Sequence, residues 1–497
     1  QNAVGMLGVI GSTLINTGKI GLGGVSSAGM YGEDSDLTNS TTASEINVNK
    51  KESAGMYAKA TATATDKTSK NEGKIEIVAD GTGKSAGMYS LIGSGKLTTE
   101  NTGTIEVAQD ESAGIFANNT GGQSEVLSSG LVKMTGIKSV GIIGKKSKIT
   151  NSGTGAKGIE ISGAGSAGIL ATDKSEVINS GRIEGNTGAS LVGISVDKNS
   201  TVSNSGTITM KTTSNTGISS TGGAVTNTGT ITLEKASSTG ISSLNGNVTN
   251  SSGATITAQE GSSVGIYAKN GTGAKTNVDA VNKGIITSSD VAGVAGMLLE
   301  NSIGKNDTGA TITIGGTGSA GMFGKLDSEI TNKGTIQATN TSITSASAGM
   351  LADTGKAVNE SVITMNGGGS AGLLGKNNAT VTNASPNGVI TTKKEKSAGI
   401  YTENSLPLNE GKITVEGKES AGIFTKNTDA DSRDIINSGT IELIGGAGLI
   451  KSAGMYAEIG GSATGTTTLE NKNSILVEQE ESAGIYIKNA ADVSKGI

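Results

Sequence analysis

The stretch Ser53-Ala54-Gly55-Met56-Tyr57 decides the fold, because it returns with small changes from one end of the chain to the other. Successive copies are separated by roughly 23 to 32 residues, which is the repeat length of a solenoid. The central glycines of the copies are Gly5, Gly29, Gly55, Gly87, Gly114, Gly141, Gly168, Gly193, Gly217, Gly240, Gly265, Gly296, Gly321, Gly349, Gly372, Gly399, Gly422, Gly454 and Gly484. These copies, about nineteen in all, predict a single repeat array over residues 1–497 with no linker in it.

A second motif, Asn-x-Gly-x-Ile, alternates with the first, as in Asn204-Ser205-Gly206-Thr207-Ile208. Both motifs alternate with period two and are rich in Ile, Val and Thr, which predicts short strands rather than helices. We expect Ile208 to point inward. We expect Asn204 to lie inward at a bend and to bond both to its own turn and to the asparagine of the next coil, while glycine supplies a positive φ.

The composition predicts a thin core. Hydrophobic residues make up 34% of the chain, aromatic residues only 2%, and glycine accounts for 79 of 497 residues. Such a chain lacks the bulky side chains of a thick globular core, whereas stacked small and aliphatic side chains suit a narrow one. The predicted fold class is therefore all-β, a parallel β-helix (β-solenoid) of about nineteen coils.

The register of the first motif predicts which side chains face outward. The residue after each central glycine is large and aliphatic, so we assign it to the core, with the small residue before the glycine as a second inward layer. The glycine and the residue two places after it then face outward. All seven Tyr and all three Phe occupy that second position, which in other copies is Ser195, Ser219 or Ser242. A stripe of exposed rings is the candidate binding site: Tyr31, Tyr57, Tyr89 and Phe116.

The charge pattern excludes nucleic acid as a partner. The formal net charge is −5, and Arg182 and Arg433 are the only arginines, so the basic surface that nucleic acid requires is lacking. Charged residues collect just before the serine of the first motif, as in Lys393-Lys394-Glu395-Lys396. A solvated ridge explains this clustering.

The residue types also limit the chemistry. The chain has no His and no Cys, which removes imidazole bases, thiol nucleophiles, disulfides and the usual zinc ligands. Acidic residues concentrate in Glu33-Asp34-Ser35-Asp36 and in 429–434, and calcium binding there is an alternative, although neither stretch has the ligand order of an EF-hand. We assign no catalytic, cofactor-binding or metal-binding residue, and expect no enzyme activity.

The recurring Ser-Ala-Gly-Met-Tyr units, such as Ser85-Ala86-Gly87-Met88-Tyr89, and the Asn-x-Gly-x-Ile units resemble the passenger regions of the large fusobacterial type V autotransporter adhesins. The resemblance covers the whole chain. It implies a right-handed parallel β-helix, exposed at the outer-membrane surface and held there by a C-terminal membrane barrel that this sequence lacks. It also implies attachment to a protein or glycan receptor on host cells or other bacteria. No binding residue of the family matches a position in this sequence.

Three functions remain open at this point. The first is a segment of an adhesin passenger that serves as stalk and binding surface. The second is a glycan-active enzyme, which requires an inward cluster of carboxylates in a groove. The third is a filament that assembles through uncapped coil ends. Because neither end of the sequence has the pattern of a polar cap, we expect a fragment of a longer passenger. The even spread of repeats and the absence of His favour the first function.

Overall fold

The computed structural model describes residues 3–61, 66–79, 83–271, 279–446, 448–460, 463 and 465–489. Residues 1–247 form one compact unit, called unit 1, and residues 248–497 form unit 2. The described residues form strands, turns and loops, and no helix among them is long and apolar enough to cross a membrane. The all-β prediction is confirmed. The prediction of one continuous array over residues 1–497 concerns both units together and stays a prediction.

Unit 1 has three parallel sheets, called faces A, B and C. Face A contains β1 (Val4–Val9), β4 (Ala28–Glu33), β7 (Ala54–Ala60), β10 (Ala86–Ile92), β13 (Ala113–Asn119), β16 (Val140–Lys145), β19 (Ala167–Thr172), β22 (Val192–Val196), β25 (Thr216–Thr221) and β28 (Thr239–Leu244). Face B contains β2 (Thr13–Asn16), β5 (Asp36–Asn39), β8 (Asp66–Asn71), β11 (Lys96–Asn101), β14 (Gln123–Ser128), β17 (Lys148–Asn151), β20 (Glu176–Asn179), β23 (Thr201–Asn204) and β26 (Ala224–Asn227). Face C contains β3 (Lys19–Leu22), β6 (Glu45–Val48), β9 (Lys74–Ile77), β12 (Thr104–Val107), β15 (Leu131–Met134), β18 (Gly158–Ile161), β21 (Arg182–Gly185), β24 (Thr207–Met210) and β27 (Thr230–Leu233).

Unit 2 has the same three faces. Face A contains β31 (Val264–Lys269), β34 (Ala295–Glu300), β37 (Ala320–Lys325), β40 (Ala348–Asp353), β43 (Ala371–Lys376), β46 (Ala398–Glu403), β49 (Ala421–Asn427), β52 (Ala453–Ile459) and β55 (Ala483–Asn489). Face B contains β29 (Val248–Asn250), β32 (Ala280–Asn282), β35 (Ile303–Asn306), β38 (Glu329–Asn332), β41 (Lys356–Asn359), β44 (Thr380–Asn383), β47 (Leu406–Asn409), β50 (Arg433–Asn437) and β53 (Thr467–Asn471). Face C contains β30 (Thr255–Ala258), β33 (Ile285–Ser288), β36 (Thr311–Ile314), β39 (Thr335–Ala338), β42 (Val362–Met365), β45 (Val389–Thr392), β48 (Lys412–Val415), β51 (Thr440–Leu443) and β54 (Ser474–Val477).

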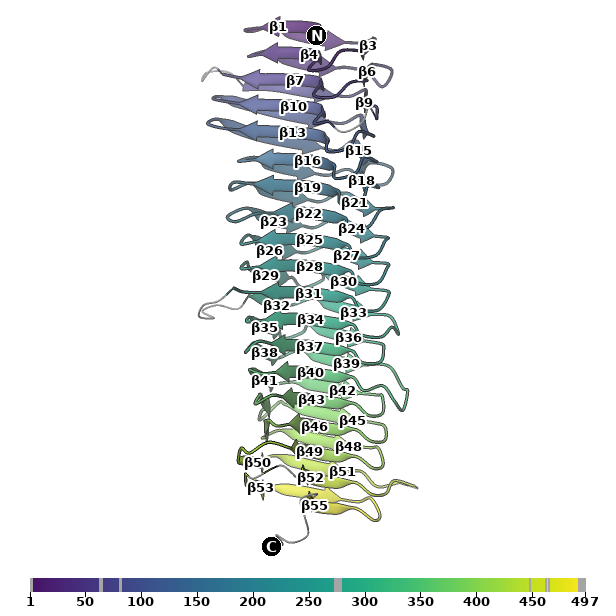
Figure 1. Cartoon of the computed structure of the whole chain (residues 1–497), viewed down its shortest axis with the longest axis vertical. Helices are drawn as coiled ribbons and strands as arrows, with labels where there is room; N and C mark the ends of the chain where they lie inside the picture. Colours follow the sequence, from purple (N-terminus) through teal and green to yellow (C-terminus); the bar gives the residue numbers. More distant parts are fainter. Residues whose placement is uncertain are drawn as a thin grey trace. The chain divides into compact units, whose positions relative to one another are not determined.

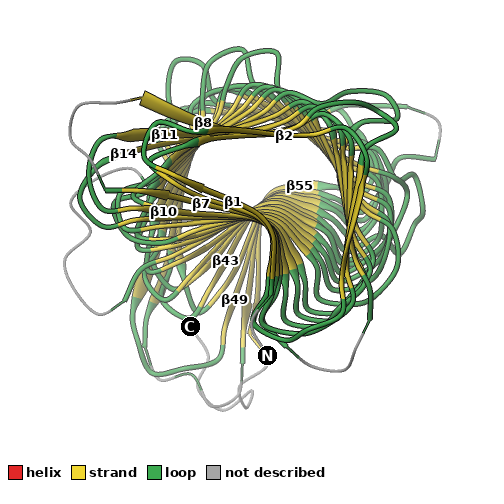
Figure 2. Ribbon diagram, turned by 90° about the horizontal axis from the view of Figure 1, so that it is seen from above, coloured by secondary structure: helices red, strands yellow, loops and turns green. Residues whose placement is uncertain are grey.

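Three consecutive strands, one on each face, make one turn of a β-solenoid. In unit 1 the face A strands lie one above another (Figure 1), and seen along the stack β1, β7 and β10 lie on one side of the interior and β2, β8, β11 and β14 on another (Figure 2). Among the described strands, β1 to β27 make nine complete turns and β31 to β54 make eight. The total of about seventeen is below the predicted nineteen coils, because β28, β29, β30 and β55 belong to turns that neither unit completes.

Equivalent residues stack on one another from turn to turn, and the interior is filled by the aliphatic columns. In β4 and β7 the register pairs Met30 with Met56 and Tyr31 with Tyr57. Met56 on face A and Ile75 and Ile77 on face C are fully buried. The assignment of the residue after the central glycine to the core is therefore confirmed, except at the first and last copies, where Met6 is partly exposed and Ile485 is 44% exposed. A narrow core of this kind is stabilised by many identical layers, each contributing apolar burial.

The central glycine faces the interior, so the predicted outward position of this residue is wrong. A Cβ atom on Gly29 would lie 2.6 Å from the Cγ2 atom of Ile46 on face C and 2.5 Å from the carbonyl oxygen of Gly55. The register of β4 with β7 pairs Ala28 with Ala54 and Met30 with Met56, but it skips the glycine between them. The strand bends at that point, and period-two alternation fails there. Ala28 is buried, with 7% of its surface exposed, and it also lines an outer groove.

A ladder of asparagine side chains runs along the corner between faces B and C. The Nδ2 group of Asn16 donates to Oδ1 of Asn39 at 2.8 Å and to the carbonyl oxygen of Gly18 in its own turn at 3.1 Å. Asn204 is fully buried and donates to Asn227 at 2.7 Å. The predicted bond to the next turn is confirmed at Asn204, and both predicted bonds, to the residue's own turn and to the next, are confirmed at Asn16. Buried amides paired in this way carry no desolvation penalty for missing partners.

The corner glycines have a different role from the predicted one. Gly206 has no positive φ, and a Cβ atom on it would overlap the carbonyl oxygen of Gly181 on the preceding turn. Gly229 is held against the carbonyl oxygen of Gly206 in the same way. These positions require glycine because successive backbones approach closely, not because of a left-handed conformation.

A ladder of serines precedes face A and explains the first residue of the Ser-Ala-Gly motif. The backbone N–H of Ser27 donates to Oγ of Ser53 at 3.0 Å, and that of Ser85 donates to Oγ of Ser112 at 3.1 Å. In unit 2 the N–H of Ser397 donates to Oγ of Ser420 at 3.1 Å. Each hydroxyl satisfies a backbone donor of the preceding turn at the point where the strand ladder has not yet begun.

Candidate functional site

The predicted aromatic stripe of unit 1 lies beside a groove of about 610 Å³ on face A. The groove floor consists of the alanines that precede the central glycines, including Ala54 and Ala86. The rings also line the groove, as do the residues that precede the serines, including Glu52, Lys84 and Glu111. The bend at each central glycine produces this groove, because it turns the alanine outward beside the ring.

The rings of Tyr31, Tyr57 and Tyr89 stack face to face along the turns. The centroids of Tyr31 and Tyr57 are 5.1 Å apart and those of Tyr57 and Tyr89 are 4.8 Å apart, with 19° between the planes in both pairs. The predicted ladder of outward rings is thereby confirmed, but the rings are half-buried and not exposed. Because neighbouring rings cover the ring faces, the stripe offers edges and hydroxyl groups to a ligand.

Phe116 differs from the other three members of the stripe. Its plane makes an angle of 89° with that of Tyr89, at a centroid distance of 5.1 Å. Phe116 therefore makes an edge-to-face contact with Tyr89 instead of stacking on it. The next residue in the column is Ile143. The column continues through Leu170 to Ser195 and Ser219, so the stripe ends within unit 1.

Burial controls the chemistry of the tyrosine hydroxyls. Burial, reinforced by the neighbouring hydroxyls of Tyr89 and Tyr31, raises the pKa of Tyr57 to about 12. Burial and the nearby carboxylate of Glu33 likewise raise the pKa of Tyr31. These hydroxyls stay protonated at neutral pH, so they act as neutral hydrogen-bonding groups and not as nucleophiles or bases.

Unit 2 has an equivalent groove of about 870 Å³ beside its own ring column. The rings of Tyr401, Phe424, Tyr456 and Tyr486 stack at centroid distances of 5.1, 4.8 and 5.3 Å, with planes 4° to 18° apart. The groove floor again consists of alanines, and serines of the buried ladder lie next to them. The sequence analysis gave this second stripe no site role, although its rings occupy the same position of the repeat as those of unit 1.

The acidic stretch 33–36 does not gather its carboxylates around one point. Glu33 forms an ion pair with Lys59 at 3.0 Å. Asp34 accepts a hydrogen bond from the N–H of Thr61 at 2.7 Å, and Asp36 accepts one from the N–H of Thr68 at 2.8 Å. The three carboxylates are thus satisfied by separate donors of the protein.

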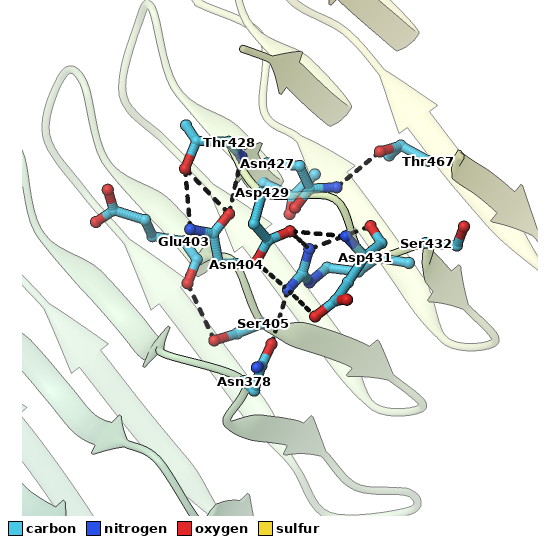
Figure 3. Close-up of polar contacts among 12 residues, drawn as sticks. Asn378, Glu403, Asn404, Ser405, Asn427, Thr428, Asp429, Asp431, Ser432 and Thr467 are labelled. Atoms are coloured by element: carbon cyan, nitrogen blue, oxygen red, sulfur yellow. Dashed lines mark hydrogen bonds and ion pairs between the residues drawn. The ribbon is translucent and has the colours of Figure 1, made fainter. Parts of the chain in front are cut away.

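The acidic stretch 429–434 contains its own cation. Arg433 is 3% exposed and forms a two-pronged pair with the carboxylate of Asp429, whose Oδ2 atom accepts from Nη2 at 2.6 Å. Figure 3 shows the polar contacts around Asp429. Nη2 also donates to Oδ1 of Asn378 at 2.7 Å. The guanidinium of Arg433 holds the pKa of Asp429 below its ordinary value. Arg433 therefore supplies at Asp429 the positive charge that a calcium ion would otherwise provide.

Titratable groups do not converge in the part of the chain that the structure describes. Among those residues no three Asp, Glu, His or Cys side chains come close enough to hold a metal ion. Pairs of opposite charge occupy the outer faces instead, such as Lys74 with Glu106 at 2.9 Å and Arg182 with Glu160 at 2.6 Å. Such half-exposed pairs add little stability and keep stacked charges from repelling one another.

Repeating turns, three parallel faces, and serine and asparagine ladders define each unit as a β-solenoid whose distinct surface features are the two aromatic grooves. No protein-family model matches the chain, and a search of curated proteins finds no significant match.

Proposed function

We propose that this chain is a segment of a surface-exposed autotransporter adhesin passenger, located at the bacterial outer membrane and mediating attachment to host cells or other bacteria. The partner would be a protein or glycan receptor on the target surface. In this proposal the repeating turns serve as a stalk, and the aromatic groove of unit 1 is the contact surface.

The observation that carries the proposal is the groove of unit 1. Alanine floor, ring edges and charged wall recur there on successive turns, so the same small contact is offered several times. Repeated weak contacts add to a strong attachment when the receptors are also present in many copies. The sequence resemblance to autotransporter passengers supports the same function.

Attachment of the purified chain to epithelial cells and to partner bacteria tests the proposal. Replacing Tyr31, Tyr57 and Tyr89 with Ser should weaken attachment at least tenfold, because the stacked ring edges are removed. The fold should survive, since Ser195 and Ser219 occupy the same column in unit 1. The matched control replaces Tyr401, Phe424 and Tyr456 with Ser and reports on the second groove alone.

Each outcome separates the proposal from its alternatives. Loss of attachment in the first variant, with an unchanged melting curve, supports an adhesin that binds through unit 1. Loss only in the second variant moves the receptor site to unit 2. No attachment by the parent chain to any cell tested contradicts the proposal. Release of reducing ends from purified glycans would favour an enzyme, and end-to-end fibres in electron micrographs would favour a filament.

A further inference from the structure

Two columns of charged residues border the ring column in the groove of unit 2. The near column, which we define as the residues directly before the serines, lines the groove wall and consists of Lys396, Glu419, Lys451 and Glu481. The far column, defined as the residues two places after each ring, consists of Glu403, Lys426, Glu458 and Lys488. Each pair flanks one ring on one turn, from the turn of Tyr401 to the turn of Tyr486.

The sign of the charge alternates along both columns. The strands are in register, so Glu403 pairs with Lys426, Lys426 with Glu458, and Glu458 with Lys488. The far column keeps this alternation over the rest of face A in unit 2, through Lys269, Glu300, Lys325, Asp353 and Lys376. Alternation within a column is explained by the fold itself, because like charges on adjacent strands repel.

Alternation within one column leaves the relative phase of the two columns open. On every one of the four turns the near and far residues have opposite signs, as with Lys396 and Glu403 and then with Glu419 and Lys426. Repulsion within each column would be relieved equally well if both columns had the same sign on each turn. The opposite phase gives a partner that contacts both columns one positive and one negative group on every turn.

The near column also carries charge where the backbone favours glycine. Lys396, Glu419 and Lys451 have φ values of 58°, 52° and 61°, in the left-handed region. Equivalent positions of other turns in unit 2 are Gly318 and Gly369, at 61° and 64°. Ser262 and Ala346 take the same conformation at equivalent positions, with φ values of 55° and 48°, so the left-handed backbone belongs to the turn and accepts side chains of several kinds.

We propose that the groove of unit 2 binds the same groove of a second copy of the chain, with the two copies parallel and in register. With a two-fold axis along the groove, each turn faces the same turn of the second copy, and the near column of one copy faces the far column of the other. Lys396 then faces Glu403 of the second copy, and Glu419 faces Lys426 of the second copy. Because the columns are in opposite phase, every facing pair on all four turns has opposite charge. The edges of Tyr401, Phe424 and Tyr456 meet along the axis.

An antiparallel arrangement fits the pattern less well. With a two-fold axis across the groove, the order of the turns is reversed in the second copy, and near-column residues face near-column residues. When the axis passes through a turn, like charges face each other throughout. Opposite charges meet only when the axis falls between turns. The parallel arrangement is complementary without this restriction, and it also suits chains that project in one direction from one surface.

The contact is small. Four turns at about 4.8 Å extend for about 20 Å along the groove, which is short for an interface of about 800 Å² per partner. A single pair of chains should therefore associate weakly and in a salt-dependent manner. Many chains on one surface would associate through the same contact by multivalency. This inference does not rest on the proposed receptor binding, since it requires only a second copy of the chain.

Sedimentation of the 497-residue chain with two charge variants tests the proposal. The near-column variant carries Lys396→Glu and Lys451→Glu, and the far-column variant carries Glu403→Lys and Glu458→Lys. In each variant half of the facing pairs become like charges, and the dimer dissociation constant should rise about tenfold. In an equal mixture of the two variants every facing pair between unlike chains is opposite again, so association should return to the parent level.

The matched control, Lys356→Glu with Lys412→Glu, makes the same change in net charge on faces B and C and should leave association unchanged. Restoration by mixing excludes misfolding as the cause, because misfolded chains do not rescue one another. A parent chain that stays monomeric at about 1 mM overturns the proposal, because a dissociation constant of about 1 mM corresponds to a binding free energy of only about −4 kcal/mol. Absence of restoration in the mixture also overturns it.

Disulfide trapping tests the parallel register, since the chain has no cysteine of its own. Chains with Lys451→Cys, mixed with chains with Glu458→Cys, should form the mixed disulfide faster than either forms a disulfide with itself. Equal rates for mixed and self disulfides, or faster self disulfides, would contradict the parallel register.

Discussion

The side-chain oxygen of Asn151 is buried and accepts no hydrogen bond, because the residue paired with it on the preceding turn is Ser128. The hydroxyl of Ser128 is itself buried without a partner among the described residues. A serine side chain is too short to reach the next turn, so the ladder that runs from Asn16 to Asn101 breaks here and resumes at Asn151.

Restoring the ladder with Ser128→Asn should stabilise unit 1. The new amide would donate to Asn151 and accept from Asn101, and each added bond contributes about 1 kcal/mol, so a gain of about 1–2 kcal/mol is expected. Urea unfolding monitored by circular dichroism measures the change. Hydrogen exchange of amides in β14 and β17 shows whether the gain is local.

The reverse change, Asn204→Ser, is the matched control for the ladder. It should remove the hydrogen bonds that link Asn204 to Asn179 and Asn227 and cost about 1–3 kcal/mol. Equal stability of the parent and both variants would show that the ladder does not stabilise the corner.

Gly29→Ala should destabilise unit 1 by about 1–3 kcal/mol, because the added methyl group would overlap both Ile46 and the backbone of Gly55. Gly484→Ala is the control, since it changes the same position of the motif but a Cβ atom there meets nothing within 4 Å. Thermal melting compares the two. A smaller effect at Gly29 than at Gly484 would mean that the central glycine does not face the core.

Ile208→Asp should cost several kcal/mol, because it places a carboxylate in a fully buried layer that has no partner for it. The neighbouring change Thr207→Asp alters the same strand at an exposed position and should have an effect within about 0.5 kcal/mol. Denaturant midpoints of both variants measure the difference. Similar midpoints would refute the inward assignment of Ile208.

The raised pKa of Tyr57 predicts a loss of stability at high pH. The folded pKa of about 12 lies above the ordinary value of 10.0, so between these values the unfolded chain has lost the proton while the folded chain keeps it. Stability from this group is complete below pH 10.0 and is lost as the pH rises toward about 12. Absorbance of tyrosinate against pH, with Tyr57→Phe as the comparison, should show one late-titrating group missing from the variant. Loss of an early-titrating group instead would contradict the buried ring.

Arg433→Gln should loosen the turn that precedes β50, because the carboxylate of Asp429 loses both hydrogen bonds from the guanidinium. A cost of about 1–3 kcal/mol is expected, less than for a fully buried pair since Asp429 is partly exposed. Lys472→Gln is the control: Lys472 and its partner Glu470 are both 50% exposed, and the cost should stay below about 1 kcal/mol. Calcium should leave the melting temperature of the parent chain unchanged, and an increase would argue for a cation at Asp429.

The candidate site was partly predictable. Strand alternation predicts the ring columns once the repeat is recognised. Tyr31, Tyr57 and Tyr89 pair with one another on successive turns, as predicted. The groove beside them was not predictable, because it arises from the bend at the central glycine. That bend depends on how closely Ile46 of face C approaches face A. The alternation of residues along one strand does not predict this distance.

The sequence by itself determined that the chain repeats, that its elements are short strands, and that Ile208 and Asn204 point inward, because these facts depend only on spacing along the chain. The tertiary structure decided what depends on contact between turns: the inward glycine, the serine ladder, the stacking of ring faces that leaves only edges exposed, and the pairing of Asp429 with Arg433. The physical reason is that hydrogen bonds, ring stacking and close backbone approach act between residues about 23 to 32 positions apart, brought together only when one turn lies on the next.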